Sequence, residues 1–371
     1  GLAPANPLAD VDQSGSTGVD DAIAVLRCVV QLAQWPIGTF TTPSLSYFTS
    51  QSFNPEHERT ALVRANYWLD EDTWSGFSAV YEASALNVGS VHGGVIDGRI
   101  YLFFDRRWPA GGFNDIGYIR SADLHGASWS TFQRVECGLE VYGAHGHLIH
   151  VEGTDSWLQP YYGWSNIAGK WVYYVKVFRT DDRGATWHDG GIVYEGDCMF
   201  VEPSGVCLGP DQVMILVRNQ FGGSISRFRS FDGGRTWTAR EDTGRNKSTL
   251  IPDVEYDGLG SVLLAYLDRG TMELELAWAT AADAWEDSHA YSRNTTRPSC
   301  NPGYPSVCAI GPNEFYVIHS EETDVSGRDC DTVGGRVSVP LSGNPFAGWR
   351  KVIDTPYKEA YGVLLDVRGT R

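Results

Sequence analysis

The sequence predicts an all-β fold built from repeated four-stranded antiparallel sheets. Aromatic residues make up 12% of the 371 residues, and 42 glycines separate short runs of β-forming residues. Both features favour strands joined by tight turns. Tryptophans also recur at intervals of about 50 to 65 residues, a spacing typical of structural repeats. The recurring residues are Trp74, Trp129, Trp187, Trp237, Trp285 and Trp349. Six such repeats indicate a six-bladed β-propeller.

One repeat, residues 200–242, shows the predicted blade in full. Its first strand carries Glu202, and its second, Gln212 to Arg218, is a β-rich apolar run that ends on a charge. A third strand covers Ile225 to Arg229. The motif S-F-D-G-G-R-T-W then follows from Ser230. We expect these segments to pair as one small sheet.

The motif that begins at Ser230 is interpreted as a turn. The side chains of Ser230 and Asp232 can accept hydrogen bonds from backbone N–H groups across a tight turn, and Gly234 supplies backbone freedom. Trp237 provides a large apolar body that can pack between neighbouring sheets. The same pattern recurs from Thr180 and, with one extra residue, from Ser121.

Residues 1–40 differ from the repeats, so we divide the chain into an N-terminal appendage, 1–40, and a propeller, 41–371. Twelve residues from position 10 fit a calcium loop with a glycine at its sixth position. The predicted oxygen ligands are Asp10, Asp12, Ser14, Ser16 and Asp21. A helix with one apolar face is predicted over Ala22 to Ala33. The alternative is a helix that Asp20 or Asp21 caps without a metal.

Charge and composition limit the expected partners and the expected cellular setting of the protein. The net charge of −17 argues against nucleic acid and anionic membranes, and no apolar run is long enough to cross a bilayer. The seven cysteines are odd in number and form no zinc-binding pattern, so the redox compartment stays open.

Polar residues fall at matching places in successive blades. The predicted innermost strands carry His92, His145, Glu202, Asp253 and Tyr304. The second strands end near Asp105, Tyr162, Arg218, Arg269 and His319. Because innermost strands are normally apolar, these side chains must either point into a central cleft or be fully paired.

Several of these motifs resemble a known superfamily. The S-x-D-x-G-x-T-W turns resemble the Asp-box, or BNR repeat, of sialidase-like six-bladed propellers. Glu202, Arg218 and Arg269 resemble, in strand position and spacing, the sites of phage endosialidases, which carry this propeller on trimeric tailspikes. The segment G-Y-P-S-V around Tyr304 resembles the strand that holds the sialidase nucleophile. The N-terminal loop resembles half of a dockerin repeat.

The resemblance implies a hydrolase that acts on an acidic, carboxylate-bearing polysaccharide of a bacterial surface or capsule. Arg218 and Arg269 would bind the carboxylate, and Tyr304, assisted by Glu202, would be the nucleophile. Asp105 is the candidate acid. Independently of the resemblance, Tyr162 and Trp164 follow a strand end near the predicted cleft, where aromatic rings suit stacking on sugar faces; the alternative is that they only pack in the sheet.

The same resemblance implies an extracellular or virion-associated protein and a homotrimer. It requires no cofactor for catalysis. A structural Ca²⁺ ion is a separate expectation for the N-terminal loop.

Two departures from the sialidase pattern change the expected activity. The F-R-I-P motif that supplies the first binding arginine is absent, although Arg59 or Arg64 could substitute, and Tyr304 precedes a proline instead of a serine. These departures favour a glycanase or a non-catalytic receptor-binding propeller over an exo-sialidase.

The histidines support a second hypothesis. His92 and His145 at matching positions could act as a general base and a charge neutraliser, as in propeller lyases that act on uronate polymers. Each could equally be a structural histidine, and His147 and His150 receive no role. Asp253 or Glu255 could also pair with Arg218 or Arg269 simply to satisfy buried charge.

Overall fold

The computed structural model describes residues 40–41, 60–68, 73–83, 87–107, 115–123, 126–247, 250–268, 271, 273–298, 305–322, 330–351 and 360–368. Contacts divide the chain into two units, Gly1–Ile37 and Gly38–Arg371. The predicted calcium loop and the helix over residues 22–33 lie outside the described residues.

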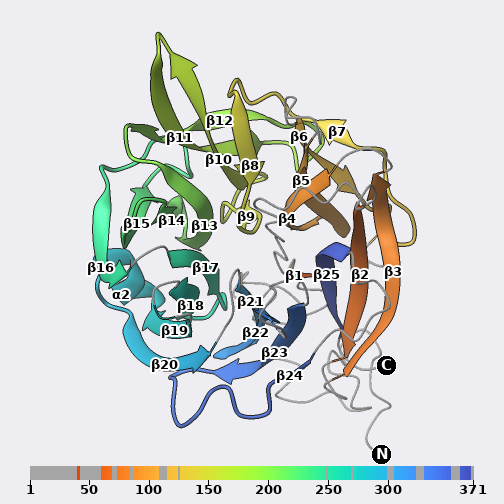
Figure 1. Ribbon diagram of the computed structural model, residues 1–371, viewed down its shortest axis with the longest axis vertical. Helices are drawn as coiled ribbons and strands as arrows, with labels where there is room; N and C mark the ends of the chain where they lie inside the picture. The colour runs from red at the N-terminus through yellow and green to blue at the C-terminus, as the bar shows by residue number, and fades with distance from the viewer. Residues whose placement is uncertain are drawn as a thin grey trace, which may run out of the picture. The chain divides into compact units, whose positions relative to one another are not determined.

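The second unit is an all-β propeller with almost no helix, as predicted (Figure 1). Five of its sheets are built from consecutive strands, and neighbouring strands within each are antiparallel. The first of these blades contains β4 (Asn87–Ile96), β5 (Arg99–Arg107), β6 (Asp115–Arg120) and β7 (Gln133–Arg134).

In the second blade the innermost strand is interrupted. This blade contains β8 (Val141–Ala144), β9 (Ile149–His150), β10 (Trp157–Ile167), β11 (Lys170–Thr180) and β12 (His188–Gly196). Both β8 and β9 pair with β10, so residues 145–148 form a break in the innermost strand.

The other three blades of consecutive strands follow in chain order. The third contains β13 (Phe200–Gly209), β14 (Gln212–Asn219), β15 (Gly223–Ser230) and β16 (Glu241–Lys247). The fourth contains β17 (Leu250–Tyr256), β18 (Ser261–Asp268), β19 (Glu273–Thr280) and β20 (Ser292–Pro298). The fifth contains β21 (Ser306–Gly311), β22 (Glu314–Glu322), β23 (Cys330–Ser338) and β24 (Arg350–Lys351).

The remaining sheet corrects the prediction of six equivalent antiparallel blades. It combines segments from both parts of the chain in the order β1 (Phe40–Thr41), β25 (Ala360–Arg368), β2 (Thr60–Trp68) and β3 (Thr73–Ala83). Strand β25 pairs with β2 in parallel. The structure therefore has five blades of the predicted kind and not six, and the remaining sheet differs because a late strand enters beside an early one.

The repeated tryptophans pack between neighbouring blades, as predicted. Trp187 packs with core residues of the first and second blades, and Trp237 with those of the second and third. Trp285 and Trp349 occupy the next two interfaces. Burial of apolar surface at these interfaces stabilises each blade against its predecessor.

The predicted turns at Thr180 and Ser230 are also confirmed. The Ser230 hydroxyl accepts a hydrogen bond from the Gly234 N–H at 2.7 Å, and Asp232 accepts from the Thr236 N–H at 2.8 Å. Thr180 and Asp182 accept the corresponding bonds in the preceding blade. The glycine at the fifth motif position has a positive φ of 86° at Gly234, which disfavours other residues.

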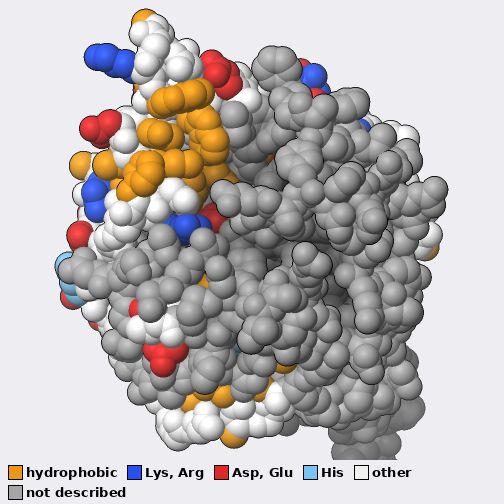
Figure 2. All heavy atoms as spheres, viewed as in Figure 1, with side chains coloured by type: hydrophobic (Ala, Val, Ile, Leu, Met, Phe, Trp, Pro, Cys, Tyr) orange, Lys and Arg blue, Asp and Glu red, His pale blue; other side chains and the backbone are white. Residues whose placement is uncertain are grey.

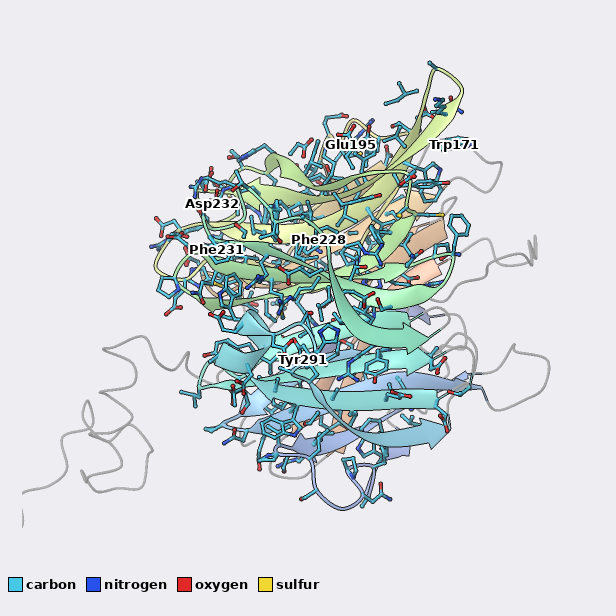
Figure 3. The ribbon with its side chains drawn as sticks, turned by 90° about the vertical axis from the view of Figure 1, so that its left-hand side faces the viewer. Trp171, Glu195, Phe228, Phe231, Asp232 and Tyr291 are labelled. Carbon is cyan, nitrogen blue, oxygen red and sulfur yellow. The ribbon has the colours of Figure 1, made fainter. Side chains whose placement is uncertain are left out.

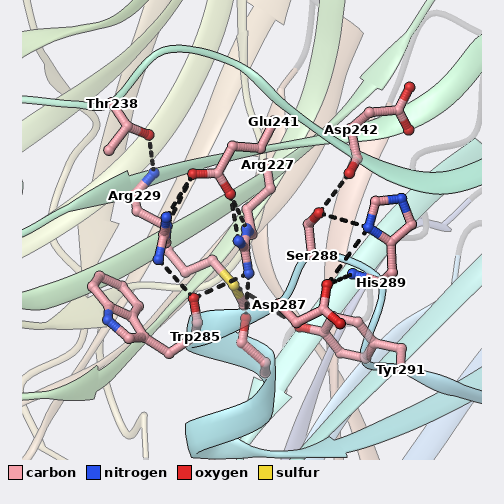
Figure 4. Close-up of polar contacts among 12 residues, drawn as sticks. Arg227, Arg229, Thr238, Glu241, Asp242, Trp285, Asp287, Ser288, His289 and Tyr291 are labelled. Carbon is pink, nitrogen blue, oxygen red and sulfur yellow. Dashed lines mark hydrogen bonds and ion pairs between the residues drawn. The ribbon is translucent and has the colours of Figure 1, made fainter.

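In the fourth blade the segment before the tryptophan forms a short helix, α2 (Ala281–Glu286), which places Trp285 in the core. Two arginines of β15 hold its end (Figure 4). Arg227 donates to the Ala284 carbonyl at 2.6 Å, and Arg229 donates to the Trp285 carbonyl at 2.8 Å. Glu241 accepts hydrogen bonds from both guanidinium groups, so the third and fourth blades are joined by a buried polar cluster.

Candidate functional site

Four of the polar residues predicted on innermost strands lie deep in the propeller. His92, His145, Glu202 and Asp253 are each less than 5% exposed. Buried charged and polar groups are costly unless they are paired. The contacts of these residues therefore decide what the site can do.

The backbone is irregular where three of these residues occur. In β4 the pairing register shifts between Gly89 and His92, and in β13 it shifts between Val201 and Ser204. In the second blade, His145 lies in the break between β8 and β9. Such bulges redirect side chains and are often found beside active sites.

Glu202 is the most strained of the site residues. Its φ is 55°, in the left-handed region that is uncommon for residues other than glycine. Its carboxylate accepts a hydrogen bond from Arg218 Nη1 at 2.6 Å, and both side chains are about 2% exposed. Arg218 lies opposite Val201 near the end of β14. The structure thus brings together two residues that the sequence analysis predicted to be neighbours, as a buried ion pair.

His92 and His145 are also neighbours. Their ring centroids lie 4.2 Å apart with an interplanar angle of 37°. Burial lowers the pKa of His92 well below its usual range, and His145 lowers it further. Burial likewise lowers the pKa of His145, although the charges of Glu202 and Asp253 act in the other direction. Both imidazoles are therefore neutral at neutral pH.

The His145 segment is held against the neighbouring blade. His145 Nδ1 lies 3.3 Å from the carbonyl oxygen of Pro203, the residue after Glu202. Gln159 Nε2 donates to the carbonyls of His145 and Gly146, each at 3.0 Å. The histidine pair and the Glu202 bulge are thus connected directly.

A second buried network, which the sequence analysis did not predict, centres on Asp253. Its carboxylate accepts hydrogen bonds from His147 Nε2 at 2.8 Å, from the Ser204 hydroxyl at 2.7 Å and from the Val307 N–H at 2.8 Å. The three donors come from three different blades. His147, Ser204 and the Val307 N–H thus bind the Asp253 carboxylate, whereas Arg218 donates to Glu202.

The charges of this network shift its titration. Burial lowers the pKa of His147, but the Asp253 carboxylate more than offsets this and raises the pKa to about 9. The pKa of Asp253 is held below its usual range by His147, against the effect of burial. Burial raises the pKa of nearby Glu255 to about 7. His147, to which the sequence analysis gave no role, is thus protonated at neutral pH. The only signal in the sequence was its alternation with His145.

Three of the other predicted site residues lie on described strands of the first two blades. Asp105 is fully buried in β5, opposite Gly89 of the β4 bulge. Tyr162 and Trp164 lie on β10, the former buried and the latter partly exposed. Tyr304 and Arg269 lie outside the described residues, and so do all five predicted calcium ligands.

The described residues contain neither a metal-binding cluster nor a membrane-spanning helix. No group of three or more His, Cys, Asp or Glu side chains in this part of the chain is arranged to hold a metal ion. No helix in it is long and apolar enough to span a membrane.

A propeller that buries carboxylate, arginine and histidine side chains on the inner two strands of its blades, and whose outer turns follow the S/T-x-D-x-G-x-T-W pattern, is of the sialidase-like class. Residues 60–309 match the BNR repeat-like domain, and the chain belongs to this family. No curated protein matches the chain significantly.

Solved structures support the same fold. A protein of unknown function from Dyadobacter fermentans DSM 18053 is 18% identical with a TM-score of 0.58, and the match covers 68% of this chain and 78% of that protein. The Hadza microbial sialidase Hz136 is 14% identical with a TM-score of 0.51, and the match covers 67% of this chain and 54% of the sialidase. At these identities the similarity establishes the fold alone.

Proposed function

We propose that the protein is a glycan-active hydrolase that acts on an acidic, carboxylate-bearing polysaccharide. The observation that carries this proposal is the left-handed, buried Glu202 at a bulge of an innermost strand, within 2.6 Å of Arg218. Backbone strain of this kind costs about 1–3 kcal/mol and persists where function requires the geometry. Membership of the BNR family, and the fold shared with a sialidase, support the same class of substrate.

In this proposal Arg218 has two tasks. Arg218 would hold Glu202 in place and contact the substrate carboxylate, with Arg269 as a second cation. Glu202 and Tyr304 would perform the chemistry, in which a neutral phenol approaches an anionic sugar without the repulsion that a carboxylate would meet. Asp105 would supply the proton to the leaving oxygen.

A second candidate function rests on the histidine pair. Two neutral imidazoles in ring contact carry unprotonated ring nitrogens that can serve as a general base, although burial weakens them as bases. A lyase that acts on uronate polymers is therefore the alternative to the hydrolase. A lyase leaves an unsaturated product that absorbs ultraviolet light, which a hydrolase cannot make. A receptor-binding propeller would bind glycan without any cleavage. A bacterial surface or capsular polysaccharide as the partner, an extracellular or virion-associated location and a homotrimeric state all remain part of the proposal.

The test is a reducing-end assay on a panel of purified bacterial capsular polysaccharides that includes polysialic acid and a polyuronate, with ultraviolet absorbance read in parallel. The hydrolase predicts new reducing ends without unsaturated product. Glu202→Gln, which keeps an acceptor for Arg218, and Arg218→Ala should each lower turnover by at least about 100-fold, as expected for a group acting in the transition state. Because Arg218→Ala leaves Glu202 buried without its cation, folding of each variant is checked by tryptophan fluorescence. Wild-type turnover in folded Glu202→Gln would refute the assignment.

A further inference from the structure

The hairpin of β10 and β11 extends beyond the rest of its sheet. Both strands have 11 residues, whereas β14 and β15 of the next blade have eight. The neighbouring strands end level with the pair Trp164 and Tyr173: β8 reaches Trp164, and β12 reaches Tyr173. Three further residue pairs continue past this point to Ile167 and Lys170. At the usual rise per residue, the ribbon projects about 10 Å beyond its neighbours.

One face of this projecting ribbon is aromatic. Trp164 is paired with Tyr173, and two residues further along Asn166 is paired with Trp171, so these side chains share a face. The rings of Trp164 and Tyr173 are in contact, with centroids 6.3 Å apart. Trp171 is 49% exposed and, within the described residues, contacts no other aromatic ring. Figure 2 shows hydrophobic side chains gathered on the surface over this part of the second blade.

The aromatic face is turned toward the blade that carries Glu202. Tyr194 of β12 lies opposite Val175 and therefore on the same face of the sheet, and its ring packs edge-on against Phe200 at 4.6 Å. Phe200 begins β13, two residues before Glu202. In Figure 3, Trp171 lies on the opposite side of the propeller from Phe231 and Asp232 of the outer turn. The hairpin thus rises at the end of the blades where β14 ends with Arg218 and Asn219.

The surface fits a slender ligand better than a second copy of the chain. A stable protein interface buries about 800 Å² on each partner. A whole aromatic side chain contributes about 150–250 Å², and Trp171 and Ile167, the most exposed hydrophobic residues of the ribbon, are each only about half exposed. Lys170 at the tip is exposed, but it pairs with Ile167 and therefore lies, like Tyr174 and Glu195, on the other face of the ribbon.

We infer that Trp164, Trp171 and Tyr173 form a platform, here called the hairpin platform, which binds an acidic polysaccharide chain outside the Glu202–Arg218 pair. Indole and phenol rings would stack on sugar faces. The inference rests on the proposed function for its substrate class. It adds a contact for long chains beyond this pair, on the ribbon that projects past the ends of β8 and β12.

The test measures binding and cleavage separately. The probes are polysialic acid and polygalacturonic acid, each as the long polymer and as the trisaccharide, and affinity is measured by calorimetry. Trp171→Ala should weaken binding of the recognised polymer about tenfold, the scale of one stacking contact, and leave trisaccharide cleavage unchanged. Phe231→Ala is the matched control, because Phe231 is an aromatic residue that is 60% exposed on the opposite side. It should leave polymer affinity unchanged.

The outcomes separate the two proposals. Equal polymer affinity in wild type and Trp171→Ala would overturn the hairpin platform and leave the hydrolase proposal standing. Polymer binding that depends on Trp171 but produces neither reducing ends nor unsaturated product would support the platform and overturn the hydrolase. A wild-type dimer that Trp171→Ala converts to a monomer would identify the ribbon as a contact between copies and overturn the glycan assignment.

Discussion

The buried pair of His147 and Asp253 makes a prediction that can be tested without knowing the substrate. Asp253→Asn keeps the size of the side chain but removes the negative charge that keeps His147 protonated. With an ordinary pKa of about 6.5 and a folded value of about 9, the interaction is worth about 3 kcal/mol at the conversion of 1.36 kcal/mol for each pKa unit. This agrees with the roughly 3–5 kcal/mol measured when one partner of a buried ion pair is removed.

The sign of the pH dependence follows from the direction of the shift. The pKa of His147 is raised in the folded protein, so the folded state binds more protons between about pH 6.5 and 9. The stabilisation is fully present below pH 6.5 and is lost as the pH rises through 9. In Asp253→Asn, burial alone acts on His147, and this loss of stability between pH 6.5 and 9 should disappear.

Urea unfolding followed by tryptophan fluorescence at pH 6, 7, 8 and 9 measures the effect. The wild type and Asp253→Asn should differ by about 3 kcal/mol at pH 6, and the difference should shrink toward pH 9. Asp197→Asn is the control, because Asp197 is exposed and such changes usually stay within about 0.5 kcal/mol. Curves for wild type and Asp253→Asn that stay parallel from pH 6 to 9 would show that His147 does not carry the charge.

Two further predictions concern the backbone. Gly146 has a φ of 73°, and an added Cβ would lie 2.6 Å from the Pro203 carbonyl oxygen, whereas Gly153 has a φ of 76° with nothing within 4 Å. Gly146→Ala should therefore lose about 1–3 kcal/mol more unfolding free energy than Gly153→Ala, and equal losses in urea unfolding would mean that the two blades do not approach closely there. Asp232→Ala removes the acceptor for the Arg235 and Thr236 N–H groups and should cost about 1–3 kcal/mol. Asp182→Ala in the equivalent turn should cost a similar amount, and a neutral Asp232→Ala would contradict the role assigned to the motif.

The repeated pattern of the chain predicted most of the fold, for reasons that are local. The turn at Ser230 depends on side chains and N–H groups within a few residues of one another, and Trp237 follows at a set distance, so their contacts could be predicted. The proximity of Glu202 and Arg218 followed from the hairpin that joins their strands. In contrast, the spacing of Trp285 in the repeat did not indicate the helix α2 around it, which forms because Thr280 caps it by accepting from the Asp283 N–H.

The parts that could not be predicted depend on contacts between blades. His147 and Asp253 are 106 residues apart, and nothing in either local sequence identifies the other. The left-handed backbone conformation of Glu202 could not be predicted either, because glutamate rarely adopts a positive φ. The projection of the β10–β11 ribbon could not be predicted, because nothing in the sequence of β10 and β11 marks the residues at which the neighbouring strands β8 and β12 end.

The sheet that contains β1, β25, β2 and β3 has a consequence for synthesis of the protein. Strand β25 lies between two strands that leave the ribosome about 300 residues earlier. During translation β1 and β2 cannot reach their final neighbour, and the nascent protein must keep their edges unpaired until residues 360–368 emerge. Shortening the chain by its last dozen residues would therefore leave an open edge in this sheet, and such a product is expected to associate with other chains through it.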